Sequence, residues 1–462
     1  MKKIVLSIAA VMAAAAFAPE ASALPVFARQ TGMACSACHF QHFPLLNGFG
    51  RAFKSAGFTM MGAQGKIEGE NLDIPNVLNL GVFATAAYQR QSNDPAGTAP
   101  KWIVPSTGGE LSLFLGGRIS EFAGFLAELG MGGGGATTIT TTAPTAAQLA
   151  AAAAAGLPVP NGISTNAGGG VATSAKLVLL FPVADARVGL VAYSVVGQGA
   201  AYSFETLNSG AVNTHKMMGN NGPANGTPAG GQHVGVPYAS QYFGTNTDAS
   251  GLSFVANNTM GFINIGKYEA AGNNIVTGAN SLPLTYARVA GTFDLAGFDS
   301  GVGIQYFGGS SAVTGTNTKA TVIDGQMQGE VAGFASGFYA SYGRAPAAPV
   351  NALAPAGVFA VSFNPSATVA KTSFNVAAEM GLIPHGTVQL AFRLAKRADF
   401  ATLVVGQNDN AVMLGATYEL AQNIGLSLHY TAQSGSYWSN QVVAGVAPIG
   451  KTATTLLLEA AF

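Results

Sequence analysis

Apolar and polar residues alternate along several segments of this chain, and this pattern constrains the fold more than any other feature. In 284–295, Val289, Phe293 and Leu295 share one face, whereas Arg288 lies on the opposite face. Alternation at every second residue is typical of a β-strand that faces an apolar phase on one side and a polar one on the other. The same pattern recurs at 111–118, 387–395 and 423–431.

The connections between these segments are alternately short and long. Short turns are predicted near 118–121, 182–185, 257–258, 296–298, 329–330, 383–385 and 421–423. Long polar or small-residue stretches are predicted near 91–108, 132–171, 200–249, 269–282, 309–318, 345–370, 400–409 and 436–451. Seven short and eight long connections imply sixteen strands, the first near 78–90 and the last near 452–462. Bacterial outer-membrane barrels have an even number of strands, short periplasmic turns and long outer loops.

The composition agrees with a wall that faces lipid. Only 9% of the residues are charged, against about 25% in soluble proteins, and the net charge is zero. After residue 23 no uninterrupted apolar run is long enough for a transmembrane helix. We therefore predict an all-β fold, a transmembrane outer-membrane β-barrel of about sixteen antiparallel strands over 76–462. Neutrality also argues against nucleic acid as a partner, because that would require a basic patch.

Both ends of the chain carry features of an exported outer-membrane protein. Residues 1–23 combine Lys2 and Lys3 with a short apolar run and small residues before Leu24, which is typical of a cleaved secretory signal peptide. The chain ends in an apolar strand with Phe462 as its last residue, and this end resembles the assembly signal of bacterial outer-membrane proteins. We expect the protein in the outer membrane of a Gram-negative bacterium, in contact with its lipid.

The chain has two cysteines, and they stand in Cys35-Ser36-Ala37-Cys38-His39. In the pattern C-x-x-C-H, two thiols are spaced to form thioethers with the vinyl groups of one haem, and the histidine can ligate the iron. The motif predicts one covalent haem c, with His39 as the proximal ligand of its iron. A covalent haem indicates redox chemistry.

Three other interpretations of the motif are weaker. A structural zinc site would need His42 as fourth ligand, and Cys35, Cys38, His39 and His42 are crowded along the chain. A thioredoxin-like redox pair would need a βαβ context, which does not surround these residues. A disulfide between the two cysteines would fit an oxidising compartment but would leave the histidine unexplained.

Residues 24–75 hold the haem motif and are too few to build an independent domain with a generous core. We expect them to form a small haem-binding plug, α-helical and irregular, that enters the barrel from its periplasmic end. Met60 and Met61 lie about two dozen residues beyond the motif, so either could fold back as the distal ligand of the iron. They could equally pack against the haem or the barrel wall. His42 and His429 are further candidates, as is an open or water-ligated site.

Two cations of the plug could hold the haem propionates. Arg51 and Lys54 could each form charge-assisted hydrogen bonds with a propionate. The alternative is that they lie on a solvated helix face or pair with lumenal carboxylates such as Glu121 or Glu128.

The stretch from Phe43 to Lys54 has the form F-P-x-L-x-x-F-G-R-x-F-K. Together with the signal peptide, the single C-x-x-C-H and a barrel of about sixteen strands, it resembles the fused monohaem cytochrome–porins, which include outer-membrane iron oxidases of iron-oxidising bacteria. The similarity at the level of motifs is confined to 35–58. The resemblance implies a haem domain inside the barrel that passes electrons from extracellular Fe(II) to a periplasmic cytochrome or other electron carrier.

Two functional hypotheses follow. The first is an electron conduit, possessing no conventional active site, in which Fe(II) is oxidised by outer-sphere transfer to the haem. The alternative is a diffusion porin in which the haem segment is a structural plug or a redox-sensing gate. A secreted soluble cytochrome is disfavoured by the low charge content. The predicted outer loops hold only scattered acidic residues and histidines, so the sequence does not predict a dedicated iron-binding site.

Overall fold

The structure is a computed structural model. It describes residues 25–62, 64–69, 73–92, 102–105, 109–131, 172–210, 238–245, 248–270, 282–309, 319–347, 363–364, 366–399, 404–440 and 450–462. The expected signal peptide at 1–23 lies outside these residues, as do large parts of the long connections. None of the helices in the described part is long and apolar enough to cross a membrane.

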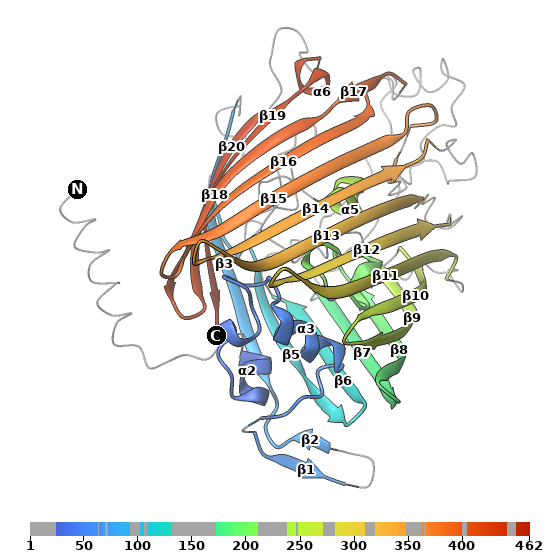
Figure 1. The fold of residues 1–462 in the computed structure, drawn as a ribbon, viewed down its shortest axis with the longest axis vertical. Coiled ribbons are helices and arrows are strands. Elements are labelled where there is room, and N and C mark those ends of the chain that lie inside the picture. The colour runs from blue at the N-terminus through green and yellow to red at the C-terminus, as the bar shows by residue number, and fades with distance from the viewer. Residues whose placement is uncertain are drawn as a thin grey trace, which may run out of the picture.

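The dominant element is a closed antiparallel β-barrel (Figure 1). Its strands are β3 (Leu80–Gln91), β4 (Trp102–Ile103), β5 (Leu111–Ser120), β6 (Ala123–Gly130), β7 (Ala172–Val183), β8 (Ala186–Val195), β9 (Ala249–Asn258), β10 (Gly261–Glu269), β11 (Leu284–Leu295), β12 (Phe298–Gly308), β13 (Ala320–Val331), β14 (Phe334–Ala345), β15 (Lys371–Ile383), β16 (Gly386–Ala398), β17 (Gly406–Asn408), β18 (Asn410–Ala421), β19 (Ile424–Ser434) and β20 (Thr452–Ala461). The short β4 and β5 both pair with β3, and the short β17 and β18 both pair with β16. In the described residues the wall therefore has sixteen strand positions.

The predicted all-β fold and its strand number are confirmed. The barrel closes where β20 pairs with β3, so the first and last predicted strands are neighbours. Backbone hydrogen bonds of 2.9 Å join Val82 and Phe462 in both directions at this seam. The segment predicted at 284–295 is β11 to the residue, and the short turns fall within a few residues of their predicted places. The chain therefore forms the closed transmembrane β-barrel that the sequence predicts.

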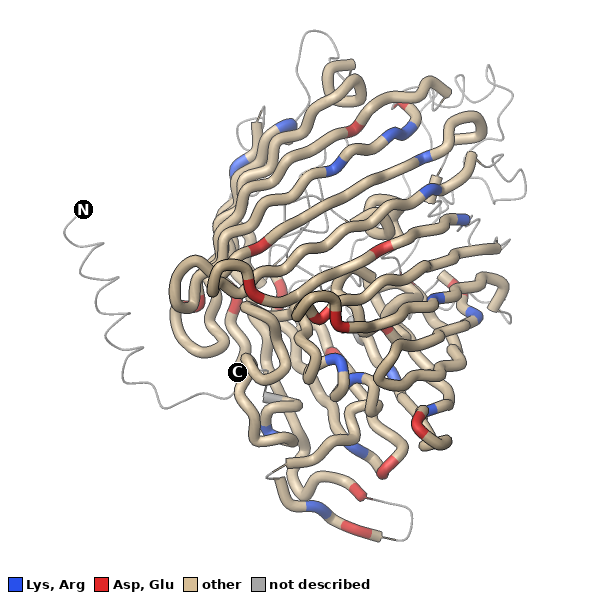
Figure 2. The backbone as a smooth tube through the Cα atoms, viewed as in Figure 1, with Lys and Arg blue, Asp and Glu red and all other residues tan. Residues whose placement is uncertain are grey.

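The two faces of the wall differ as the alternation predicts. Val289 and Leu394 are 48% and 60% exposed on the outer face, while Arg288 and Arg393 are 0% and 3% exposed on the lumenal face. Large apolar side chains on the outer face are suited to contact with the hydrocarbon of the membrane, from which the polar lumenal face is separated. Figure 2 shows that charged residues are sparse along the middle of the strands.

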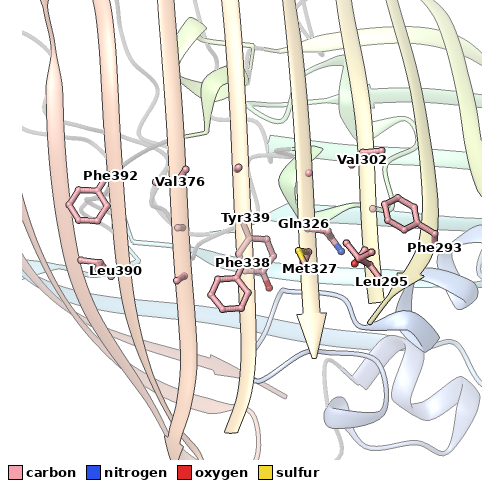
Figure 3. A pocket seen from close by; sticks show the side chains of 16 residues that line it. Phe293, Leu295, Val302, Gln326, Met327, Phe338, Tyr339, Val376, Leu390 and Phe392 are labelled. Atoms are coloured by element: carbon pink, nitrogen blue, oxygen red, sulfur yellow. The ribbon is translucent and has the colours of Figure 1, made fainter. Parts of the chain in front are cut away.

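The wall carries a shallow apolar depression across β11–β16 (Figure 3). Small residues, Gly325 and Ala340, face each other across β13 and β14, with Val302 and Val376 on either side of them. Phe338 and other large side chains rim the depression, which has a volume of about 470 Å³. Because this is the lipid-facing side, the depression accommodates acyl chains rather than a polar ligand.

The N-terminal segment forms a small plug at the end of the barrel where the short turns lie (Figure 1). It contains α2 (Pro25–Thr31), the single-turn helix η1 (Cys35–Ala37) and α3 (Gly48–Ser55), followed by a hairpin of β1 (Lys66–Glu68) and β2 (Asp73–Pro75). Phe27, Phe53 and Phe58 pack together, and their cluster joins lumenal residues of the wall such as Val178. The plug thus shares an apolar core with the barrel instead of building its own.

Parts of the connection expected at 200–249 fold inward rather than outward. They form the single turns η2 (Ala200–Tyr202) and η3 (Asn208–Gly210) and the helix α5 (Ala239–Phe243), which contacts β13, β14 and β15. Arg288 holds part of this connection inside the barrel, because its guanidinium pairs with both Asp324 of β13 and Glu205 of the inward segment. A further helix, α6 (Ser436–Ser439), lies at the opposite end from the plug (Figure 1).

Candidate haem-binding site

The haem motif folds into one tight turn. The Cys38 and His39 amides both donate to the Cys35 carbonyl, at 3.0 and 2.8 Å. The two cysteines do not form a disulfide. The turn directs the side chains of Cys35, Cys38 and His39 to the same cavity, so the structure brings together the three residues that the motif predicts.

A hydrogen bond at Nδ1 orients the His39 ring so that Nε2 is available to ligate iron. Its Nδ1 lies 3.1 Å from the Leu45 carbonyl oxygen, which fixes the orientation of the ring and favours a proton on Nδ1. The His39 ring also packs edge-on against Phe43, at 5.2 Å between ring centroids. Burial lowers the pKa of His39 to about 4, so the imidazole is neutral at physiological pH. A neutral imidazole with Nε2 unoccupied by these contacts is the form that binds iron.

The cavity beside the motif is mostly apolar. It has a volume of about 220 Å³ and lies between the plug and the lumenal faces of β5, β6 and β7. Aromatic and aliphatic side chains dominate its lining, among them Phe27, Phe53, Phe58, Phe114 and Leu126. The polar residues that line it come from the barrel and the inward segment (Glu128, Lys176, Gln198 and Tyr202) and from the plug (Thr31, His39 and Lys54).

This lining fits a haem c. Two cysteines and a neutral imidazole would supply the covalent and axial contacts, and the apolar lining would supply the environment that a porphyrin ring requires. Haem bound there would carry one electron at its iron, while the chain would orient it and exclude water. The described residues include no group of three or more His, Cys, Asp and Glu placed to hold a bare metal ion.

The methionines proposed as distal ligands lie outside this lining. Met60 packs against the cluster of Phe53 and Phe58, and its carbonyl accepts a hydrogen bond from the Gln30 amide at 2.8 Å. Met61 is partly buried near it. The methionine that lines the cavity is Met33, whose side chain is 40% exposed. The assignment of Met60 or Met61 stays a prediction, and Met33 is an additional candidate.

Arg51 is directed to the barrel wall rather than to the cavity. Its guanidinium pairs with Asp299 of β12 and donates to the Gln328 amide oxygen of β13 at 3.3 Å. Of the two cations considered for the propionates, Lys54 lines the cavity and Arg51 does not. Arg51 therefore holds the plug against the wall, which is the salt-bridge alternative for this residue, although with a different carboxylate from those considered in the sequence.

His42 makes a second connection between plug and wall. Its Nε2 lies 2.9 Å from Glu379 and 3.2 Å from the Gln389 amide nitrogen, and Gln389 in turn contacts His429 at 2.9 Å. Burial acts to lower the pKa of His42, but the Glu379 carboxylate outweighs it and raises the pKa above the usual value. His42 and His429 thus belong to a hydrogen-bonded network of the wall.

Helix α3 approaches the haem motif too closely for any side chain at Gly50. A Cβ atom there would lie 2.1 Å from the Cys38 carbonyl oxygen. Asn47 fixes this approach, because its side chain caps α3 by accepting from the Gly50 amide at 2.9 Å and its amide donates to Cys38 O at 3.0 Å. In the F-G-R-x-F-K run, Gly50 therefore permits close packing of α3 on the haem motif, and Arg51 contacts the wall.

Lys176 and Met33 are cavity residues that the sequence alone did not indicate. Lys176 occupies a lumenal position of β7, so its alternation with outward residues marks it as facing the interior. Nothing in the sequence shows that this position faces the plug, because the contact joins segments more than one hundred residues apart.

No family model matches this chain, and no curated protein matches it. Among solved structures it is similar to the outer-membrane channel DcaP of Acinetobacter baumannii, with 10% identity, a TM-score of 0.47 and coverage of 87% of this chain and 100% of that one. It is also similar to the trimer form of OmpT from Vibrio cholerae, with 8% identity, a TM-score of 0.43 and coverage of 84% and 98%. A mutant of the Rh. blastica porin matches with 11% identity, a TM-score of 0.43 and coverage of 84% and 100%. These similarities concern the barrel fold.

Proposed function

We propose that this protein is an outer-membrane electron conduit with one covalent haem c bound through Cys35, Cys38 and His39. An electron donor outside the cell, Fe(II) in the first instance, reduces the haem, and a periplasmic carrier reoxidises it. The observation that carries the proposal is the cavity at the haem motif: both thiols and the imidazole line an apolar space inside a membrane barrel.

The contents of the lumen favour electrons over solutes as the cargo. Ser209 and Tyr238 of the inward segments are fully buried, at 0% exposure each. Ser209 donates to Asp324 at 2.8 Å, and Tyr238 packs in one cluster with Leu45 of the plug. A lumen occupied by plug and inward segments opposes diffusion of solutes, whereas electron transfer needs only proximity and a suitable reduction potential.

The chain's own residues place the redox centre and keep it in place. The Leu45 carbonyl orients His39, and Arg51 and His42 tie the plug to Asp299 and Glu379 of the wall. Since outer-sphere transfer makes no bond to the donor, a conventional active site is not required.

The periplasmic end of the barrel fits a positively charged carrier. Glu121, Asp185, Asp294 and Glu330 are exposed at or beside four of the short turns. Figure 2 shows Asp and Glu at the lower ends of the strands, where the plug also lies, together with Lys and Arg. Opposite charge on a soluble carrier would increase its rate of association, and salt would weaken this effect.

A diffusion porin with a haem-bearing plug or gate is the second candidate. The closed barrel of sixteen positions with a polar lumen supports it, because this architecture also suits passage of small solutes. The two candidates differ in what crosses the membrane, so they can be separated directly.

The test uses purified protein in liposomes that enclose an electron acceptor. With Fe(II) outside, the conduit predicts reduction of the enclosed acceptor and no swelling in an osmotic gradient of a small sugar. The double variant Cys35→Ala/Cys38→Ala keeps the barrel and should lose the electron transfer. Swelling without reduction of the acceptor would refute the conduit and favour the porin.

A further inference from the structure

We propose that Lys54 and Lys176 together form a site for two carboxylates, those of the haem propionates, at the end of the cavity away from the cysteines. This inference rests on the proposed function, since it assigns residues to the haem that the conduit requires.

Lys176 is a buried cation without a carboxylate partner among the described residues. Its side chain is 5% exposed, and its amino group forms no ion pair with a carboxylate of the described residues. Nζ donates to the Tyr202 carbonyl oxygen at 2.9 Å. It also lies over the rings of Tyr202 and Phe58, at 4.1 and 5.4 Å from their centroids. One carbonyl and two aromatic faces leave capacity for further hydrogen bonds, because an ammonium group has three donors.

Lys54 approaches the same cavity from the plug. It lies in the last turn of α3 and lines the cavity with Lys176. It forms no ion pair with a described carboxylate, although Glu205 is near enough to favour its charged form. Burial outweighs Glu205 and lowers the pKa of Lys54 to about 8. Two lysines thus face one cavity from opposite sides, the plug and the wall.

Two cations in an apolar cavity destabilise the protein unless a ligand compensates them. An uncompensated buried charge is costly, and like charges repel. Glu128 also lines the cavity, but its two oxygens accept from Gln198 at 2.9 Å and Ser112 at 3.1 Å. A ligand with two carboxylates would match the two lysines in number and in charge.

The positions of the thiols and the lysines agree with the shape of haem. In haem, the two propionates project from the edge of the porphyrin opposite the vinyl groups that react with the cysteines. The Cys35 thiol contacts Asn423 in the turn between β18 and β19. Lys176 lies on β7, five strand positions further around the wall. The cavity therefore has a thiol end and a cationic end.

The test is an equilibrium redox titration of the full-length haem protein in detergent, followed by haem absorbance. Lys176→Met and Lys54→Met keep side-chain length and remove one charge each. Because a nearby cation favours the reduced haem, each substitution should decrease the equilibrium constant for reduction about tenfold, the size expected for one charge acting through partly buried protein. The double variant should decrease it further, and Lys176→Arg should restore most of the loss.

Lys66→Met provides the matched control, since Lys66 lies on the exposed β1–β2 hairpin and pairs with Glu68 and Asp73. It should leave the titration unchanged. The heat-dependent migration of the folded barrel in gels verifies that each variant folds. Unchanged titrations in both lysine variants would refute the carboxylate site while leaving the conduit intact. Absence of haem from the wild-type protein would instead refute the proposed function.

Discussion

The contact between helix α3 and the haem motif makes a sharp prediction at Gly50. In Gly50→Ala, the new Cβ would lie 2.1 Å from Cys38 O and 3.1 Å from Leu46 Cδ2, whereas ordinary contacts begin at 3.4 Å. Helix and motif must therefore separate by roughly 1 Å or more, the overlap implied by close packing of protein interiors. The motion would break the hydrogen bond from Asn47 N to Cys38 O, now 3.0 Å.

The expected size of the effect follows from two opposing contributions. Overpacking of a fixed backbone contact costs about 1–3 kcal/mol. Alanine in place of glycine within a helix recovers up to about 1 kcal/mol. We expect net destabilisation of the docked plug by about 1–2 kcal/mol, because the obstructing atoms belong to the backbone and cannot rotate away.

Hydrogen exchange followed by mass spectrometry measures this effect on peptides that cover 35–56. Local opening should increase about tenfold for each 1.4 kcal/mol, provided that exchange is limited by the opening equilibrium. Gly291→Ala in β11 is the control for a glycine-to-alanine change, since a Cβ there would meet its nearest atom at an ordinary distance of 3.7 Å and the residue does not belong to the plug. Equal protection in Gly50→Ala and wild type, or equal loss in both variants, would refute the reasoning.

Three further predictions concern the same plug. The Glu379 carboxylate raises the pKa of His42, so protonated His42 stabilises the docked plug. This stabilisation is complete below the unfolded pKa of about 6.5 and is lost as the pH rises through the higher folded value. The thermal midpoint of the plug should therefore decrease between pH 6 and pH 9, and Glu379→Gln should remove this dependence. Arg51→Met should destabilise docking by about 1–3 kcal/mol through loss of the contact with Asp299, yet leave the haem reduction potential unchanged in a redox titration. Phe53→Ala should cost about 3–5 kcal/mol in thermal unfolding, because its side chain is 5% exposed within the shared core.

Each of these predictions has an outcome that contradicts it. A thermal midpoint independent of pH would show that the pair with Glu379 does not stabilise the plug. A lowered haem reduction potential in Arg51→Met would indicate that Arg51 contacts a haem propionate after all. Unfolding of Phe53→Ala like that of wild type would mean that the plug does not share its core with the wall.

The barrel could be predicted from the sequence because its determinants are local. Alternation within β11 and β16, and turn residues between strands, report the lipid and lumenal faces one strand at a time. The number of strands followed from counting such segments. The haem motif was equally local, since five consecutive residues define it.

The interior of the lumen could not be predicted in the same way. Arg288 meets Asp324 and Glu205 across 36 and 83 residues of chain, and nothing near any of the three indicates its partners. The inward course of the segment before β9 depends on this pairing. Arg51 illustrates the same limit: the sequence placed a cation near the haem, but Asp299, 248 residues away, determines where the guanidinium goes.

The distribution of ion pairs then explains why two lysines remain available for a ligand. Three arginines each pair with a carboxylate of the barrel wall: Arg288 with Asp324, Arg393 with Asp409 and Arg51 with Asp299. A low-dielectric interior favours such compensation for every buried charge. Lys54, Lys176 and Lys371 have no such carboxylate partner among the described residues. Lys371 lies over the rings of Tyr242 and Phe243, whereas Lys54 and Lys176 both line the cavity that holds the two thiols. Two lysines that lack a carboxylate partner beside an apolar cavity fit a ligand that supplies its own negative charges.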